Sequence, residues 1–350
     1  MMTIRDATRS DNEGLLSLTA LTPMDGEISI RSDRQPDFFR LLDMRGNSHL
    51  VVAEDRGSIV GCLSITRVES HVDGGPESVH VLGDMKTHPA YQKSGLPFRL
   101  VKALYRLPIA AEVDLVVAAT AYGNDKVRTL FDGRAGLPRA QALGVFRIYQ
   151  LLPSRRGSRL NTGTVQEEAE SPDLLSFYND HFRRYQFSPV LRPGSLQDAR
   201  HLVARSDGAI HAAASLMDVG PARQHTLIRL PFALSALAAC ARAARRIAPV
   251  PNLPRENETV RTLSIRAMAC RDGHEHALDG VIQKARNISF AEGFHFLGAT
   301  VHERDPMARL LARYPKFSFK SLGFVLSLKR SDQELLRLTQ RIPYEDFSLF

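Results

Sequence analysis

One stretch of the sequence decides how the chain is expected to fold, and it reads VLGDMKTHPAYQKSGLPFRL over residues 81–100. A β-strand is predicted over residues 79–86. Apolar residues recur at helical spacing from Leu96 through Leu100 and Leu104, which predicts a helix. The stretch is therefore expected to form a strand, a short loop and a helix in direct succession.

The loop of this unit has the features of an anion-binding site. Free amides at the start of a helix point into the loop, and the helix dipole favours negative charge there. Gly95 lets a phosphate approach the backbone closely, and Gln92 and Lys93 supply further donors. The alternative is an ordinary turn between a strand and a helix.

The segments on either side of this unit complete the order β-α-α-β-β-β-α-β-α-β. Strands are predicted over residues 2–5, 50–53, 58–66, 79–86, 114–121 and 144–152. Helices are predicted from residue 10 and over residues 37–44, 96–105 and 126–131.

An internal repeat extends this order to the rest of the chain. The dipeptide Ala-Thr occurs at 119–120 and again at 299–300, an offset of 180, and Leu-Gly occurs at 143–144 and at 322–323, an offset of 179. A nearly constant offset indicates a duplicated unit. The second copy has about 27 extra residues, which include an Ala- and Arg-rich helix over 232–248.

The repeat divides the chain into two expected domains. The first covers residues 1–153, and the second covers residues 173–350 and includes a C-terminal tail. Residues 154–172 are polar, lack apolar periodicity and are predicted to be a linker.

The loop resembles the acyl-CoA motif of the GNAT (GCN5-related N-acetyltransferase) superfamily, Q/R-x-x-G-x-G/A, with Gln92, Gly95 and Pro97 at the defined positions. Pro97 departs from the usual Gly or Ala and removes one amide donor. The resemblance implies an α/β (α+β) fold of two tandem GNAT-like domains. Each would have a mixed, mostly antiparallel central sheet flanked by helices.

The resemblance also implies acetyl-CoA, or another acyl-CoA, as co-substrate. In this family the strand before the loop splays from its neighbour, and pantetheine lies in the gap. The coenzyme-binding residues implied here are Met85, Lys86, Thr87, Gln92, Lys93, Ser94, Gly95, Leu96, Pro97 and Asn124.

A second family feature begins at Asn124, which is similar to the asparagine that contacts the coenzyme. Asn124 is equally suited to be a plain helix N-cap. The tyrosine that protonates the departing thiolate in the family is replaced here by Phe131, so Tyr122, or alternatively Tyr91, is the candidate acid.

Amine acylation also needs a base, because a free amine is mostly protonated at pH 7. Asp84 is the best-placed carboxylate, with His80 and Glu77 as alternatives; each of the three also suits a structural or solvated role. The histidines at 274 and 276 do not share a helix face, so no metal site is expected.

The matching loop of the second domain is different. Gly273 is kept, but Asp272 and Glu275 bring negative charge to the place where phosphate would lie, and Arg304 stands at the position of Asn124. We expect a degenerate coenzyme site in this half, which would act as support or as one wall of the substrate pocket.

Composition narrows the cellular context. The longest apolar stretch, residues 230–241, is too short to cross a bilayer, and we expect no membrane partner. Three scattered cysteines and a charged start favour the cytoplasm. The net charge of +8 suits a polyanion, but the basic residues are spread out, so no nucleic-acid partner is expected.

These observations favour an acyl-CoA-dependent N-acyltransferase, most simply one that moves acetyl to a small-molecule primary amine. The alternative is a non-catalytic binding or scaffold protein on the same fold, which Pro97 and Phe131 favour. The acceptor amine and the oligomeric state are not readable from the sequence.

Overall fold

The structure is a computed structural model that describes all residues except 1, 25–27, 108–111, 113, 156–164 and 246. Its first half contains strands β1 (Thr3–Asp6), β3 (Ser48–Asp55), β4 (Ser58–Val72), β5 (Gly75–Thr87), β6 (Leu115–Ala121) and β7 (Gln141–Leu151). Its helices are α1 (Asn12–Ala20), α2 (Arg40–Arg45), α3 (Leu96–Tyr105) and α5 (Asp125–Arg128). This is the predicted order of elements.

The second half repeats this order with strands β8 (Val165–Glu168), β10 (Arg200–Ser206), β11 (Ala209–Asp218), β14 (Thr262–Cys270), β15 (Phe296–His302) and β16 (Lys316–Ser327). Its helices are α6 (Pro172–Phe182), α7 (Phe232–Ala244), α8 (Glu275–Ala291), α9 (Met307–Leu311) and α10 (Asp332–Leu338). Strand β8 lies inside the segment expected to be a linker, and part of that segment, 156–164, is outside the described residues.

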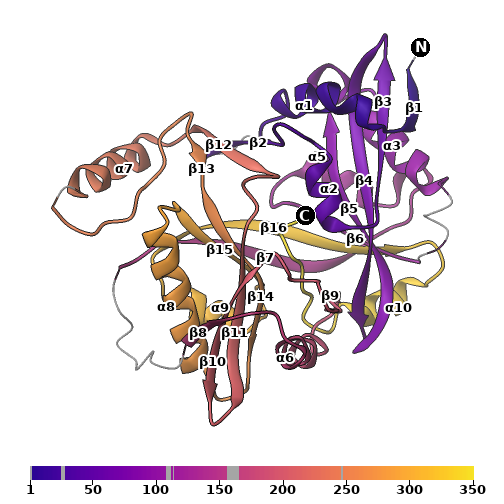
Figure 1. Ribbon diagram of the computed structural model, residues 1–350. Helices are drawn as coiled ribbons and strands as arrows, with labels where there is room; N and C mark the ends of the chain where they lie inside the picture. The colour runs from indigo at the N-terminus through magenta and orange to yellow at the C-terminus, as the bar shows by residue number, and fades with distance from the viewer. Residues whose placement is uncertain (1, 25–27, 108–111, 113, 156–164, 246) are drawn as a thin grey trace.

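One large mixed sheet runs through both halves in the order β1-β3-β4-β5-β6-β16-β7-β15-β14-β11-β10-β8 (Figure 1). β5 pairs with β6 in parallel, and so does β14 with β15, while the other neighbours in this order are antiparallel. The succession of pairings is therefore the same from either end. The expected fold class, a mostly antiparallel sheet flanked by helices, is confirmed.

The two halves exchange their last strands at the centre of the sheet. β7 pairs with β15 of the second half, and β16 pairs with β6 of the first half. β7 and β16 also pair with each other, with Gly144 opposite Gly323. Backbone hydrogen bonds thus join the halves along the two longest central strands.

The strand register tests the repeat at the level of single residues. Ala119 lies opposite Gly323 in the first half, and Ala299 lies opposite Tyr149 in the second. The parallel pairing ends at Ala118 in the first half and at Gly298 in the second, one residue before each Ala-Thr pair, so the Ala-Thr match joins residues in equivalent places. The Leu-Gly match does not, because the pairing equates Gly323 with Tyr149 rather than with Gly144.

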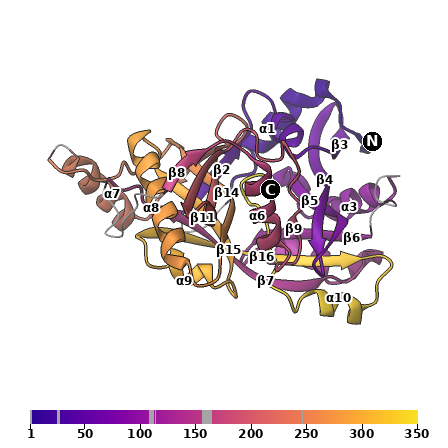
Figure 2. The same cartoon turned by 60° about the horizontal axis from the view of Figure 1, so that its bottom comes forward.

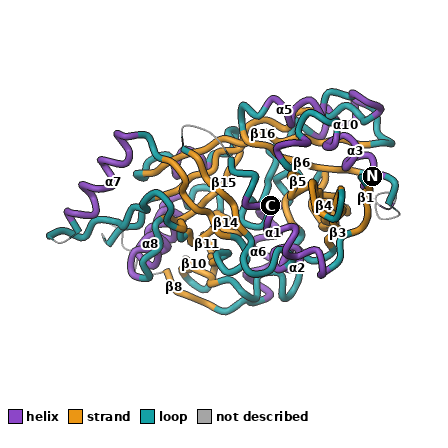
Figure 3. Tube along the Cα trace, turned by 90° about the horizontal axis from the view of Figure 1, so that it is seen from above, coloured by secondary structure: helices purple, strands orange, loops and turns teal. Residues whose placement is uncertain are grey.

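Helices cover the sheet through the apolar faces that the sequence indicates. In α3, Leu96, Leu100 and Leu104 are fully buried against the first half of the sheet. In the second half, α8 lies beside β10 and β11 (Figure 3). Its residues Leu278 and Val281 belong to an apolar cluster with the strands.

A small second sheet, which the sequence did not indicate, also ties the halves together. Its order is β13 (Thr259–Val260), β12 (Gln224–Arg229) and β2 (Ser29–Asp33). Since β2 belongs to the first half and β12 to the second, the loop after β2 is held in place by the second half. A short strand β9 (Ser188–Pro189) likewise pairs with β4.

The exchange predicts that the halves do not fold apart. A fragment of residues 1–153 lacks β16, so β6 would carry an unpaired central edge. We expect the full chain to unfold in one calorimetric transition. The fragments 1–153 and 165–350 should each lack a cooperative transition at that midpoint. Two fragments that melt separately at unchanged midpoints would contradict this prediction.

Candidate functional site

A gap opens in the sheet where β5 leaves β6. The two strands pair only from Val79 to Leu82, and beyond this point β6 keeps its other neighbour, β16. The register between β4 and β5 shifts at Cys62 and Ser64, which places one extra residue in β5 near Asp84. Asp84 has a φ of 53°, as expected for a residue in a β-bulge.

This bulge turns the end of β5 away from β6. Lys86 and Thr87 still pair with β4, but no pairing between described strands engages their β6 side. Met85, Lys86 and Thr87 therefore lie on the splayed segment that the sequence analysis assigned to pantetheine. Their backbone groups on that side are free to bind an extended amide-containing chain.

The loop between β5 and α3 is held by local bonds that leave its amides free. The Tyr91 hydroxyl donates to Asp55 Oδ2 at 2.7 Å, and the Ser94 hydroxyl donates to the Tyr91 carbonyl at 2.7 Å. The first helical bond of α3 runs from Arg99 N to Gly95 O. The amides of Lys93, Gly95, Leu96 and Phe98 lack a partner among the described residues, whereas Pro97 has no amide hydrogen.

Gly95 is the N-cap of α3 and is suited to this position for two reasons. Its φ is 71°, a left-handed conformation that glycine adopts without strain. A Cβ built there would meet nothing within 4 Å, so the space in front of it is open. The side chains of Gln92 and Lys93 are exposed beside it, and neither forms a hydrogen bond or an ion pair with a described residue.

The remaining residues assigned to the coenzyme and to acid catalysis lie at the mouth of the gap. Asn124 Oδ1 accepts a hydrogen bond from Val127 N at 3.4 Å, which is the geometry of a helix cap. Tyr122 follows β6 and is 59% exposed, with Lys320 Nζ 5.5 Å from its ring centre. Its hydroxyl is therefore accessible to a ligand.

Phe131 has a packing role. Its ring stacks on Phe324 of β16 with a centroid distance of 4.3 Å and an interplanar angle of 13°. Residue 131 thus packs against the exchanged strand, and a tyrosine here would have to place its hydroxyl at the edge of this stack.

Asp84 lies in a buried ion-pair network. One carboxylate oxygen pairs with Arg34, and the other accepts from Arg45 Nη1 at 2.5 Å and from Ser64 Oγ at 2.8 Å. Burial would raise the pKa of Asp84, but the two guanidinium groups hold it well below its usual range. A carboxylate so stabilised in its ionised form is a weak proton acceptor.

The two alternative bases lie away from the gap. His80 is fully buried where β5 still pairs with β6, and burial lowers the pKa of its ring to about 4. Glu77 pairs with Arg330 at 2.5 Å. Neither side chain is on the splayed part of β5.

The second half adds one cationic group, Arg223, to the network around Asp84. Arg223, at the start of β12, donates to the backbone carbonyls of residues 347, 348 and 350. Burial lowers the pKa of Arg223 to about 9 and that of the neighbouring His225 to about 3. Burial also lowers the pKa of Lys86, which forms no ion pair with a described residue. The sequence carries no local signal for this grouping.

The C-terminal segment also contacts the network around Asp84, and it contains an acid that the sequence analysis did not single out. Leu349 O accepts from Arg45 Nε at 2.5 Å, so residues 343–350 reach the partners of Asp84. Within this segment, burial and the nearby Asp346 raise the pKa of Glu345 to about 8. The sequence does show two adjacent acids, Glu345 and Asp346, among the mostly apolar residues at the C-terminus. That pattern could have marked Glu345 as a candidate.

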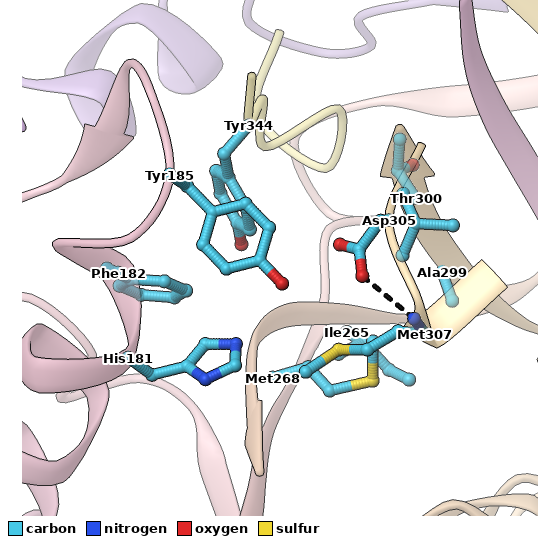
Figure 4. A pocket seen from close by; sticks show the side chains of 11 residues that line it. His181, Phe182, Tyr185, Ile265, Met268, Ala299, Thr300, Asp305, Met307 and Tyr344 are labelled. Atoms are coloured by element: carbon cyan, nitrogen blue, oxygen red, sulfur yellow. Dashed lines mark hydrogen bonds between the residues drawn. The ribbon is translucent and has the colours of Figure 1, made fainter. Parts of the chain in front are cut away.

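In the second half, β14 separates from β15 as β5 separates from β6, but different side chains line the gap. β14 pairs with β15 only up to Ser264, and an extra residue, Arg266, shifts its register with β11. The resulting gap contains a cavity of about 20 Å³, room for one water-sized group. Figure 4 shows Tyr185, Asp305 and His181 directed into it, with Asp305 capping Met307 N at 2.8 Å.

The loop of the second half supplies its own anion. Gly273 N donates to Glu275 Oε1 at 3.4 Å, and Asp272 pairs with Arg184 at 2.6 Å. Arg304 is occupied by three backbone carbonyls of residues 339–341. A carboxylate thus stands beside the amide where the first half offers an open loop. No cluster that could hold a metal ion occurs among the residues that the structure describes.

Comparison with known proteins gives one family match and several structures of the same fold. Residues 18–136 match the acetyltransferase (GNAT) family. The match includes the splayed strand, the loop and α3. No curated protein matches the sequence.

Solved structures share the fold over nearly the whole chain at low sequence identity. N-myristoyltransferase of Saccharomyces cerevisiae with bound myristoyl-CoA has a TM-score of 0.61 at 10% identity, covering 93% of this chain and 82% of the other. A GCN5-related N-acetyltransferase from Anabaena variabilis has a TM-score of 0.54 at 9% identity, with 93% and 72% covered. A putative acetyltransferase from Pyrococcus horikoshii has 0.52 at 14% identity, with 94% and 90% covered.

The network around Asp84 predicts a large and pH-dependent stability effect. Asp84→Asn leaves two buried guanidinium groups without a counter-ion, which should cost about 3–5 kcal/mol at pH 7. The folded pKa of Asp84 lies below the unfolded value, so its contribution is present above a pH of about 4 and is lost as the pH falls. The difference between wild type and variant should therefore shrink in acid.

Urea unfolding at pH 7 and at several acidic values measures this. The matched control is Asp43→Asn, because Asp43 pairs with Arg9 at an exposed site and should contribute at most about 1 kcal/mol. Equal losses in the two variants, or a pH-independent difference for Asp84→Asn, would show that the buried pairs do not stabilise the fold in this way.

Proposed function

We propose that the protein is an acyl-CoA-dependent N-acyltransferase that moves an acetyl group from acetyl-CoA to a primary amine. The observation that carries the proposal is the combination of the splayed β5 with the open amides around Gly95. One feature suits an extended pantetheine and the other suits its phosphates, and they adjoin each other in the chain. The family match over the same residues supports this assignment.

The proposed binding mode gives each assigned residue a task. The loop 92–97 holds the pyrophosphate through backbone amides, with Lys93 and Gln92 as side-chain donors. Met85, Lys86 and Thr87 bind pantetheine along the strand. Asn124 contacts the coenzyme from the other side of the gap while it caps α5.

The proposed reaction is direct attack of the neutral amine on the thioester carbonyl. A C–N bond forms, the C–S bond breaks, and the coenzyme leaves as a thiolate. Backbone amides of the splayed strand stabilise the developing oxyanion. Because thiol pKa values lie near 8.5, the thiolate is a fair leaving group, and Tyr122 is the proposed proton donor to it.

The amine must lose a proton, and we assign this task to Glu345 rather than to Asp84. Asp84 is held ionised by Arg34 and Arg45 and keeps them in place. Glu345 has a pKa of about 8, close to the pH at which a general base is most effective, and its segment contacts Arg45. The second half would then contribute to catalysis through its tail.

A non-catalytic binding protein is the second candidate, and two observations favour it. Pro97 removes one donor from the phosphate loop, and Phe131 is packed against Phe324, where it offers no proton. Tight binding of acetyl-CoA without turnover on a broad panel of amines would establish this alternative.

We place the activity in the cytoplasm, because the three cysteines, Cys62, Cys240 and Cys270, are all free.

The asymmetry of the two loops predicts one acetyl-CoA per chain. Gly95→Glu adds a negative charge beside the pyrophosphate and should weaken acetyl-CoA binding by at least about 2 kcal/mol, or about 30-fold. Gly273→Glu is the matched control, because Gly273 has a φ of 79° and equally open surroundings. It should leave binding unchanged.

Titration calorimetry on both variants, with circular dichroism to confirm folding, measures this. A stoichiometry of two, or a loss with Gly273→Glu as large as with Gly95→Glu, is incompatible with a single site in the first half.

The role of Glu345 predicts a pH signature. For the wild type, kcat/KM should rise through a pH near 8 as Glu345 ionises, in addition to the rise from the free amine. Glu345→Gln should lower kcat/KM about 10²-fold and remove that limb. Glu345→Asp should retain the limb at a reduced rate. A Glu345→Gln enzyme with the profile of the wild type would exclude Glu345 as the base.

A further inference from the structure

Helix α7 belongs to a segment with an unusual charge pattern. From Arg229 to Arg255 the sequence contains five arginines, at 229, 242, 245, 246 and 255, and neither aspartate nor glutamate. Between Leu230 and Ala241, Ser235 is the one residue with a polar side chain. A strongly apolar stretch is thus followed by clustered positive charge.

The structure places this segment away from the body of the protein. Figures 1 and 2 both show α7 at one end of the molecule, beyond α8 and the sheet. Ala238 is its buried residue and packs with Leu253 and Phe296. The helix is part of the insertion that the first half lacks, so the repeated fold does not require it.

Two of the three large apolar side chains of α7 face solvent, and Leu234 is half-buried. Phe232 is 89% exposed, Leu237 is 56% exposed, and Ile247, just after the helix, is 90% exposed. The smaller residues that complete this face are Ala233, Ala236, Ala239, Cys240 and Ala243. They recur at a spacing of three to four residues, so they form a continuous apolar stripe along the helix.

We propose that this stripe docks the protein onto an anionic lipid surface, with α7 lying in the plane of the interface. Such helices combine an apolar face that enters the headgroup region with arginines that attract anionic lipid. Arg245, at the C-terminal end of α7, and Arg255, later in the same segment, are exposed and supply that charge. The proposal is independent of the reaction catalysed in the first half.

A second copy of the chain fits the same surface less well. A two-fold contact would bring the same arginines together across the interface. The nearest acids are engaged in their own chain, since Glu256 accepts from Leu230 N at 2.8 Å and Glu258 from Arg255 N at 2.9 Å. Anionic headgroups neutralise the arginines that a second copy would leave unpaired.

The proposed mode does not require a spanning segment. Among the described residues, no helix has the length and apolar character needed to cross a membrane. The sequence led us to expect no membrane partner because residues 230–241 are too short to span. A helix that lies along the surface has no such length requirement: 13 residues give α7 a length of about 20 Å.

Vesicle flotation tests the proposal with the full-length protein. We expect wild type to float with phosphatidylcholine vesicles that contain phosphatidylserine, and to bind pure phosphatidylcholine weakly. Phe232→Ser combined with Leu237→Ser should reduce binding at least about tenfold. Leu336→Ser is the matched control, because Leu336 is 52% exposed on α10 of the other end, and it should bind as wild type does.

Arg245→Glu should weaken binding to the anionic vesicles most at low salt. Because Ile247 lies beyond the helix end, Ile247→Ser gives a second loss that does not depend on the helix being intact. Wild type that fails to float, or substitutions in the stripe that leave flotation unchanged, would overturn the proposal. So would sedimentation velocity that shows a dimer which Phe232→Ser with Leu237→Ser converts to a monomer.

Discussion

The exchange of β7 and β16 is the interaction on which the rest of the structure depends. Each strand hydrogen-bonds to the other and to the other half's parallel unit, so the backbone ladder is continuous from β1 to β8. One edge of β6 pairs with β16, and the other edge pairs with β5 only as far as Leu82. The gap that forms the candidate site thus has one wall fixed by a strand from the far end of the chain.

The bulge at Asp84 is the second constraint, because the backbone conformation that bends β5 also places the carboxylate between two arginines. A residue with positive φ in the middle of a strand is held by its surroundings, and here Arg34, Arg45 and Ser64 supply them. The same arginines are held by other parts of the chain, Arg45 by the carbonyl of Leu349. The shape of the gap is therefore coupled to a buried network that draws on both halves.

Local patterns predicted the elements well because the helices and strands follow apolar periodicity, as in α3 with Leu96, Leu100 and Leu104. The glycine at the start of α3 and the acids beside Gly273 were also readable, since they are adjacent to these turns in the sequence. The contacts between residues far apart in the chain could not be predicted from the sequence. The strand exchange, the pairing of β2 with β12 and the ion pairs of Asp84 depend on contacts between residues that are 39 to 212 positions apart, which leave no local periodicity. The sequence therefore placed Asp84 near the loop but did not indicate its ion pairs with Arg34 and Arg45.

The pairing of β2 with β12 has a consequence for how such a protein changes over time. Arg34 directly follows β2, and β2 takes its position from a strand of the second half. Substitutions in β12 therefore move a wall of the first half's network while the loop at Gly95 is left intact. A substitution in β12, far away in the sequence, can thus alter the surroundings of Asp84 without any change in the loop itself.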